Sequence, residues 1–140
     1  MPEYPIRLYR YYSDLENESR AIHTRQGSVT SGTRELYIYI YEFEKLKEHE
    51  YMLGNAFFDI YDAAQPLNSY IWSSTRSPKT GKYEIYGSYE NSGKIIVTRG
   101  DKEKLILSGT FSGKLKEVDG EEIIEIKDGR FDINLKTLQP

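Results

Sequence analysis

The sequence contains no cysteine, so it offers neither a disulfide framework nor thiol chemistry. Histidine is almost as scarce: His23 and His49 are the two present, and they lie in different, polar surroundings. A histidine-centred catalytic triad or a two-histidine metal site would need both to converge with acidic partners on folding. We expect both histidines to be solvated surface residues, and we predict no metal site and no cofactor.

Concentrated positive charge and long apolar runs are also missing. The chain has 19 Lys and Arg against 22 Asp and Glu, a net charge of -3, and no stretch forms the basic stripe that a nucleic acid backbone requires. No run approaches the ~18 apolar residues of a membrane-spanning helix. The first twelve residues, MPEYPIRLYRYY, lack the uninterrupted apolar stretch of a secretory signal. We therefore expect no nucleic acid partner and no membrane span in this chain.

Large side chains come mainly from aromatic residues. The sequence has 13 Tyr, 5 Phe and 1 Trp, which supplement a sparse aliphatic content. A chain of 140 residues has the usual length of one domain and buries roughly 68% of the surface that its unfolded form exposes. With no repeat, linker or low-complexity tract, we predict one globular domain over residues 1–140.

Hydrophobic residues alternate with a period of two in most segments, and no apolar stripe of helical spacing reaches helical length. The pattern predicts an all-β, antiparallel fold of about nine or ten strands, either a sandwich or a flattened up-and-down barrel with lipocalin-like closure. Residues 42–51 read as a loop with one helical turn. Strands are expected at residues 6–12, 20–26, 36–43, 56–61, 69–73, 82–89, 95–98, 105–115, 123–126 and 130–135.

Residues 93–135 predict a C-terminal meander of strands joined by tight turns. Leu107, Phe111 and Leu115 share one face with Gly109 and Gly113, where the missing side chains let a strand bend or another backbone approach. The Asp-Gly pairs within residues 118–121 and 127–130 suit hairpin turns. We expect the last three strands to pair in sequence order.

Two short runs carry a resemblance to a known family. Residues 108–112 (SGTFS) and residues 127–132 (KDGRFD) follow residues 93–97 (GKIIV) in an order that resembles a family of small lipoproteins of unknown function from Bacteroidetes. The match covers about a third of the chain, and Gly113 stands where the family usually has an aromatic residue. The resemblance implies a secreted, lipid-anchored β domain in the periplasm, on the outer membrane or at the cell surface. It brings no active site, and no lipobox cysteine is present.

The sequence offers only weak candidates for a catalytic site. The serine in residues 109–113 (GTFSG) is misplaced for a nucleophile elbow. A glycosidase needs two facing carboxylates, for which Asp59, Asp62 and the acids of residues 121–125 are available, but the latter suit a solvated strand edge better. The turn aspartates have local backbone roles and are too sparse for a calcium loop. We predict no catalytic residue.

Aromatic residues supply the candidate ligand-binding set. An aromatic platform for sugar rings or an apolar ligand could form from neighbouring strands, although cross-strand aromatic pairs also stabilise sheets by roughly 0.2–1 kcal/mol each without any ligand. The set consists of Tyr61, Tyr70, Trp72, Tyr83 and Tyr86.

Three functions from different classes remain open. The first is a non-catalytic binding or adaptor module of the envelope, with a glycan, an apolar small molecule or an envelope protein as partner. The second is a lipocalin-like carrier, which requires an apolar internal cavity of about 300 Å³ or more. The third is a small glycosidase or lyase, which requires facing carboxylates or a histidine beside an acid.

Overall fold

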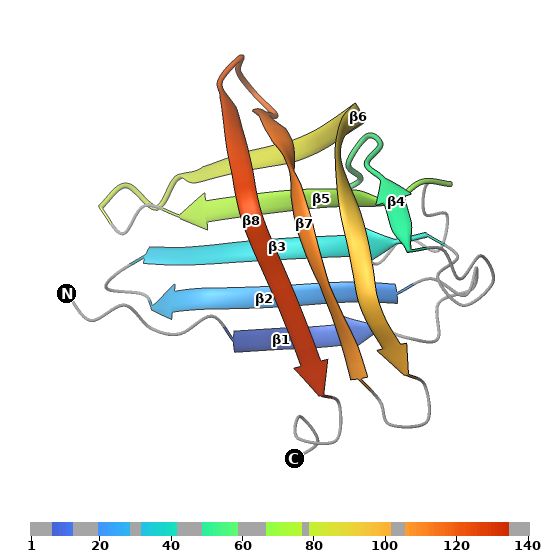
Figure 1. The fold of residues 1–140 in the computed structure, drawn as a ribbon. Coiled ribbons are helices and arrows are strands. Elements are labelled where there is room, and N and C mark those ends of the chain that lie inside the picture. Colours follow the sequence, from blue (N-terminus) through green and yellow to red (C-terminus); the bar gives the residue numbers. More distant parts are fainter. Residues whose placement is uncertain are drawn as a thin grey trace.

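The structure is a computed structural model that describes residues 7–12, 20–28, 32–41, 49–58, 67–76, 79–101 and 106–134. All secondary structure in this part of the chain is strand, and all eight strands belong to one antiparallel sheet (Figure 1). The predicted all-β antiparallel class is confirmed. The strands are β1 (Arg7–Tyr12), β2 (Arg20–Ser28), β3 (Gly32–Ile40), β4 (Glu50–Met52), β5 (Tyr70–Arg76), β6 (Tyr83–Asp101), β7 (Ile106–Glu117) and β8 (Ile123–Asn134).

The sheet follows the chain in the order β1-β2-β3-β5-β6-β7-β8, and β4 pairs with β6 beside this path. The first half of β6 pairs with β5, and its second half pairs with β4, while β7 follows β6 along the other side. In Figure 1 the second half of β6, with β7 and β8, runs across β1, β2, β3 and β5. The sheet is therefore curled into a half-barrel, with an inner face between its two halves and an outer face.

The curl is made at residues 89–92 of β6. Ser88 pairs with Leu115, and the next paired position is Gly93 with Gly113, so β6 has more residues than β7 between these two pairs. Within this stretch Asn91 has a φ of 60°. Extra residues in one strand bend it and increase its local twist. The two strands predicted at 82–89 and 95–98 are for this reason one bent strand.

A short segment after β4 braces this corner. The Ser88 hydroxyl donates to the Gly54 carbonyl oxygen at 2.8 Å and accepts from the Ile71 amide at 3.0 Å. Leu53 donates its amide to the Gly93 carbonyl at 2.9 Å. Backbone groups left unpaired where β5 and β6 separate are thus satisfied inside the fold.

The turn predicted at residues 127–130 is wrong, because β8 continues through it. Phe111 pairs with Gly129, whereas Gly113 pairs with Ile126, so β8 carries one extra residue against β7. Asp128 has a φ of 54°. An Asp-Gly pair supplies a positive φ to a β-bulge as readily as to a hairpin, and here it makes a bulge.

Two further expectations differ at the corner. Residues 56–58 are not in a strand, because the amide of Ala56 is bound to the Ser88 carbonyl at 3.0 Å as part of the brace, and residues 59–61 lie outside the described part. Strand β4 was not predicted; it forms at the end of the expected loop of residues 42–51, through pairing with distant residues 94–96.

The inner face holds the main core. Its side chains are buried and packed as one cluster: Ile22, Ile38, Ile40, Tyr51, Leu53, Ile71, Tyr86, Ile95, Val97, Leu107, Phe111, Leu115, Phe131 and Ile133. Leu107, Phe111 and Leu115 face inward as the alternation predicts. The predicted central strand at residues 36–43 corresponds to β3, which lies between β2 and β5 and buries both of its faces.

Glycine and phenylalanine alternate across β7 and β8 in this core. Gly109 pairs with Phe131, and Phe111 pairs with Gly129, so each ring lies over the glycine opposite to it. A Cβ on either glycine would come within 2.5 Å of a ring atom. The two rings also stack on each other, with centroids 6.4 Å apart. The predicted C-terminal meander is confirmed for β6, β7 and β8, but its last two predicted strands do not pair with each other, because residues 123–126 and 130–134 belong to one strand, β8, and both pair with β7. Gly109 and Gly129 are explained by the packing of the two rings.

Candidate functional site

Aromatic rings gather on the outer face of β2, β3 and β5. Across the sheet, Tyr39 pairs with Tyr70, and Tyr37 pairs with Trp72. Alternation directs their isoleucine neighbours to the inner face. A second buried cluster results, formed by Ala21, Tyr37, Tyr39, Tyr70 and Trp72.

The rings of this outer cluster form a continuous ladder. Ring centroids are 4.9 Å apart for Tyr39 and Tyr70, 5.9 Å for Tyr70 and Tyr37, and 5.3 Å for Tyr37 and Trp72, all stacked. Tyr39 and Tyr70 have no exposed area. Burial, followed by the proximity of Tyr37 and Tyr39, raises the pKa of Tyr70 far above its ordinary range. These rings stabilise the sheet, and Tyr70 is out of reach of a ligand.

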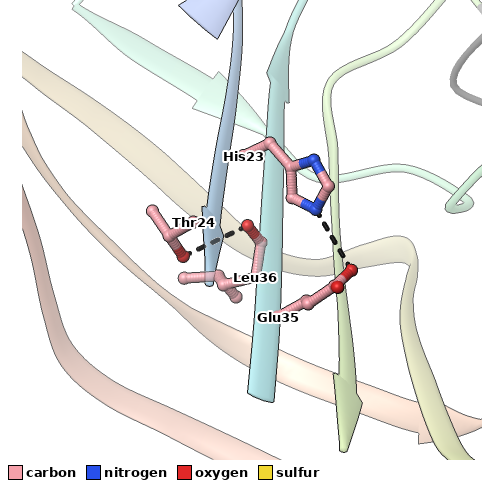
Figure 2. A network of polar contacts seen from close by, with 4 residues as sticks. All are labelled: His23, Thr24, Glu35 and Leu36. Carbon is pink, nitrogen blue, oxygen red and sulfur yellow. Dashed lines mark hydrogen bonds and ion pairs between the residues drawn. The ribbon is translucent and has the colours of Figure 1, made fainter. Parts of the chain in front are cut away.

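A histidine–carboxylate pair ends the ladder. The Nε2 atom of His23 on β2 lies 3.2 Å from Oε2 of Glu35 on β3 (Figure 2). The imidazole is 5% exposed and contacts Tyr37 and Trp72 edge-on, with each centroid 5.7 Å away. His49 is exposed. The expectation of a solvated histidine is therefore wrong for His23, because the antiparallel register of β2 and β3 places it against Glu35 and two rings.

Next to the ladder, β5 and the first half of β6 present side chains that solvent reaches. Phe58 is 43% exposed and Tyr83 is 59% exposed, and they lie near opposite ends of this stretch. Phe58 sits over Gly87, which has no Cβ to exclude it, and its ring centroid is 6.4 Å from that of Trp72. We call this surface the β5–β6 strip; it consists of Phe58, Trp72, Ser74, Arg76, Tyr83, Ile85 and Gly87.

Two polar groups of the β5–β6 strip have unused hydrogen-bonding capacity. In the described part of the chain, Nε1 of Trp72 and Nε of Arg76 are buried and have no hydrogen-bond partner. The guanidinium carbon of Arg76 lies 5.8 Å from the centroid of the Tyr83 ring, a cation–π arrangement. Because an unpaired buried donor costs free energy, each of these N–H groups would gain from donating a hydrogen bond to a ligand's oxygen.

The predicted aromatic set does not form one platform. Tyr70, Trp72 and Tyr83 lie on the outer face, where only Tyr83 is well exposed, whereas Tyr86 is 5% exposed and belongs to the inner core. Tyr61 lies outside the described residues. His23, Glu35, Phe58 and Arg76 were not in the set, since their proximity to the rings depends on strand register and on the path of residues 53–58.

Tyr86 is instead part of the core with one polar anchor. Its hydroxyl donates to Oε2 of Glu122 at 3.1 Å. Burial, and secondarily the hydrogen bond and charge of Glu122, raises the pKa of Tyr86 from 10.0 to about 12. The fold therefore favours the protonated phenol.

This shift predicts a loss of stability at alkaline pH. The contribution of the Tyr86 proton is fully present below pH 10.0 and is lost as the pH rises towards about 12. We expect the difference in unfolding free energy between wild type and Tyr86→Phe to shrink over this range in urea titrations. Glu122→Gln should leave most of the effect, because burial is the larger cause; parallel losses in wild type and Tyr86→Phe would contradict the assignment.

A shallow hollow of about 220 Å³ lies on the outer side of β6, β7 and β8. Lys94, at its rim, is 3.5 Å from the carboxylate of Glu50, and both side chains are largely solvated. The volume is below the ~300 Å³ typical of small-molecule pockets, and the hollow is open to solvent. Its lining residues are Lys94, Ile96, Thr110, Phe111, Ser112, Asp128 and Arg130.

Among the described side chains, no three or more His, Asp or Glu residues are grouped so as to hold a metal ion. The same part of the chain contains no helix long and apolar enough to cross a membrane. Comparison with protein-family models, curated proteins and solved structures gives no match.

Proposed function

We propose that this domain is a non-catalytic binding module that engages its ligand or partner through the β5–β6 strip. The observation that carries the proposal is the combination of two exposed aromatic rings, Phe58 and Tyr83, with the unpaired donors of Trp72 and Arg76 on one sheet face. Aromatic residues and arginine are the side chains most enriched at recognition surfaces.

The packing of the inner face favours a ligand bound at the surface and disfavours an apolar ligand carried inside the fold. Its buried side chains pack as one contiguous cluster between the two halves of the sheet. The ~220 Å³ hollow described above is open to solvent and shares only Phe111 with this cluster. A lipocalin-like role would need an apolar cavity within it.

An envelope location is part of the proposal and rests on the family resemblance alone. Residues 108–112 and 127–132, which carry it, form the pairs of Gly109 with Phe131 and Phe111 with Gly129. Core packing therefore gives these two runs a structural role in this chain. Fractionation of cells that express the full gene product, with a check for a lipid anchor, tests the location.

A second candidate, a small glycosidase or lyase, is favoured by one observation: Glu35 holds His23. A carboxylate-oriented histidine is a common general base. Against it, the imidazole is 5% exposed and its Nε2 atom is already engaged by the carboxylate. If the candidate holds, wild-type protein releases reducing ends or unsaturated products from polysaccharides, and His23→Gln abolishes this activity.

The binding proposal is tested on an array of glycans and peptides, with thermal shift to follow each hit. We expect wild type to retain a defined class of ligand and the double variant Phe58→Ala/Tyr83→Ala to lose it. Both residues are substantially exposed, so the variant should keep its melting temperature within a few degrees, about the effect of 1 kcal/mol or less. Hits that the double variant retains would contradict the assignment of the strip.

A further inference from the structure

We infer that the β5–β6 strip binds a carboxylate-bearing oligosaccharide; this inference rests on the proposed binding function and specifies its ligand. Both the kind of contact and the sign of the charge follow from the residues of the strip.

The strip is about as long as a short oligosaccharide. Tyr83 and Gly87 are four residues apart on β6, a distance of about 13 Å, and Phe58 stands over Gly87. Exposed aromatic faces at both ends suit the C–H faces of pyranose rings. Ser74, which is 8% exposed, and the Trp72 indole N–H lie between them as hydrogen-bonding groups for hydroxyls.

The charge of the strip selects an anion. Arg76 makes no ion pair with any described residue, and Glu35, the acid on the neighbouring strand, is engaged by His23. Residues 76–83 contain Arg76, Lys79 and Lys82 and no acid. A guanidinium binds a carboxylate through two parallel hydrogen bonds, which gives both affinity and orientation.

The topology disfavours an extended peptide as the ligand. Peptides that join a sheet need a strand edge with unpaired backbone groups. Here β5 is paired with β3 and β6, residues 86–87 of β6 are paired with both β5 and β7, and Ser88 is paired with β7. Residues 83–85 of β6 are paired with β5, and the Ile85 carbonyl accepts from the Val118 amide. Most of this surface therefore offers a ligand side chains and no free strand edge, which suits stacked sugar rings.

The test is isothermal titration calorimetry of the intact chain with trigalacturonic acid. We expect saturable binding, weakened about tenfold or more by Arg76→Gln, as for loss of a charged hydrogen bond, and by Tyr83→Ala. Arg34→Gln removes an exposed charge from β3, and Ile123→Ala removes an exposed apolar side chain from β8; both should bind as wild type. Circular dichroism melts confirm that each variant is folded, and Arg76→Lys should recover only part of the affinity.

The methyl ester of the trisaccharide and a glutamate-rich peptide separate the alternatives. Equal affinity for the acid and its methyl ester would overturn the carboxylate inference while leaving the binding module intact. Tighter binding of the peptide, or no effect of Arg76→Gln, would also overturn the inference. If trigalacturonic acid fails but another ligand class is lost on mutation of Phe58 and Tyr83, the inference fails and the proposed function stands; if no class binds, both fail.

Discussion

Gly93→Ala is expected to lower the unfolding free energy by at least about 3 kcal/mol, the upper end of the usual cost of an added methyl group or more. Gly93 faces Gly113 on β7, where the two backbones approach each other closely. A Cβ at Gly93 would overlap the Ser112 carbonyl oxygen and the Cα of Gly113, both backbone atoms. Neither can rotate away, so β6 and β7 would have to separate beside the corner.

Gly120→Ala is the matched control. A Cβ there would also meet an atom at short range, but this atom is a carboxylate oxygen of Glu117, at the end of a flexible side chain. We expect a cost below about 0.5 kcal/mol, as for ordinary surface changes. Urea unfolding followed by circular dichroism measures both variants, and equal stability of the two would contradict the close approach of β6 and β7.

Phe111→Ala is expected to lower the unfolding free energy by about 3–5 kcal/mol, the usual cost of removing a buried phenylalanine ring. Phe111 is 7% exposed, lies over Gly129 and stacks on Phe131. Its removal opens a cavity where the bulge of β8 meets β7. Chemical denaturation of wild type and variant gives the loss directly, and a value below about 1 kcal/mol would contradict the packing.

A double-mutant cycle isolates the contact between ring and glycine. A Cβ on Gly129 would lie 2.5 Å from a ring atom of Phe111, and the φ of Gly129 is not in the positive region. Gly129→Ala should therefore cost about 1–3 kcal/mol in wild type, from overpacking alone. In a Phe111→Leu background the added cost should be clearly smaller, whereas additive effects would mean that the ring does not restrict position 129.

Alternation of hydrophobic residues was sufficient to predict most strands. Residues 105–115 and 36–43 each show clear faces, and β7 and β3 bury the expected side chains. Asp-Gly at residues 128–129 was ambiguous, since a hairpin and a bulge need the same backbone conformation. The merging of 82–89 with 95–98 depends on pairing with β7 across the bend, a non-local contact that alternation does not encode.

The sequence predicted less of the candidate site than of the fold. Tyr83 and Tyr86 are close in the chain, but they are an odd number of residues apart, which places them on opposite faces of a strand. Once β6 is known to be a strand, alternation therefore assigns Tyr83 to the strip and Tyr86 to the core. By contrast, the contact of His23 with Glu35 needs the register of β2 and β3. The lack of an acidic partner for Arg76 also depends on this register, because Glu35 on the neighbouring strand contacts His23.

Residues 108–112 and 127–132 have a physical role in the core. Gly109, Phe111, Gly129 and Phe131 form reciprocal ring-over-glycine pairs in the core. Such a motif constrains how β7 and β8 pack, and it carries no information on a ligand.

The most direct measurement of the central proposal is a ¹H–¹⁵N correlation spectrum during titration with trigalacturonic acid. Trp72 is the single tryptophan, so its indole N–H gives one unambiguous signal from the middle of the β5–β6 strip. We expect saturable shifts of this signal and of the amides of β5 and the first half of β6. Shifts confined to β7, β8 or the hollow at Lys94 and Arg130, with an unmoved indole signal, would contradict it.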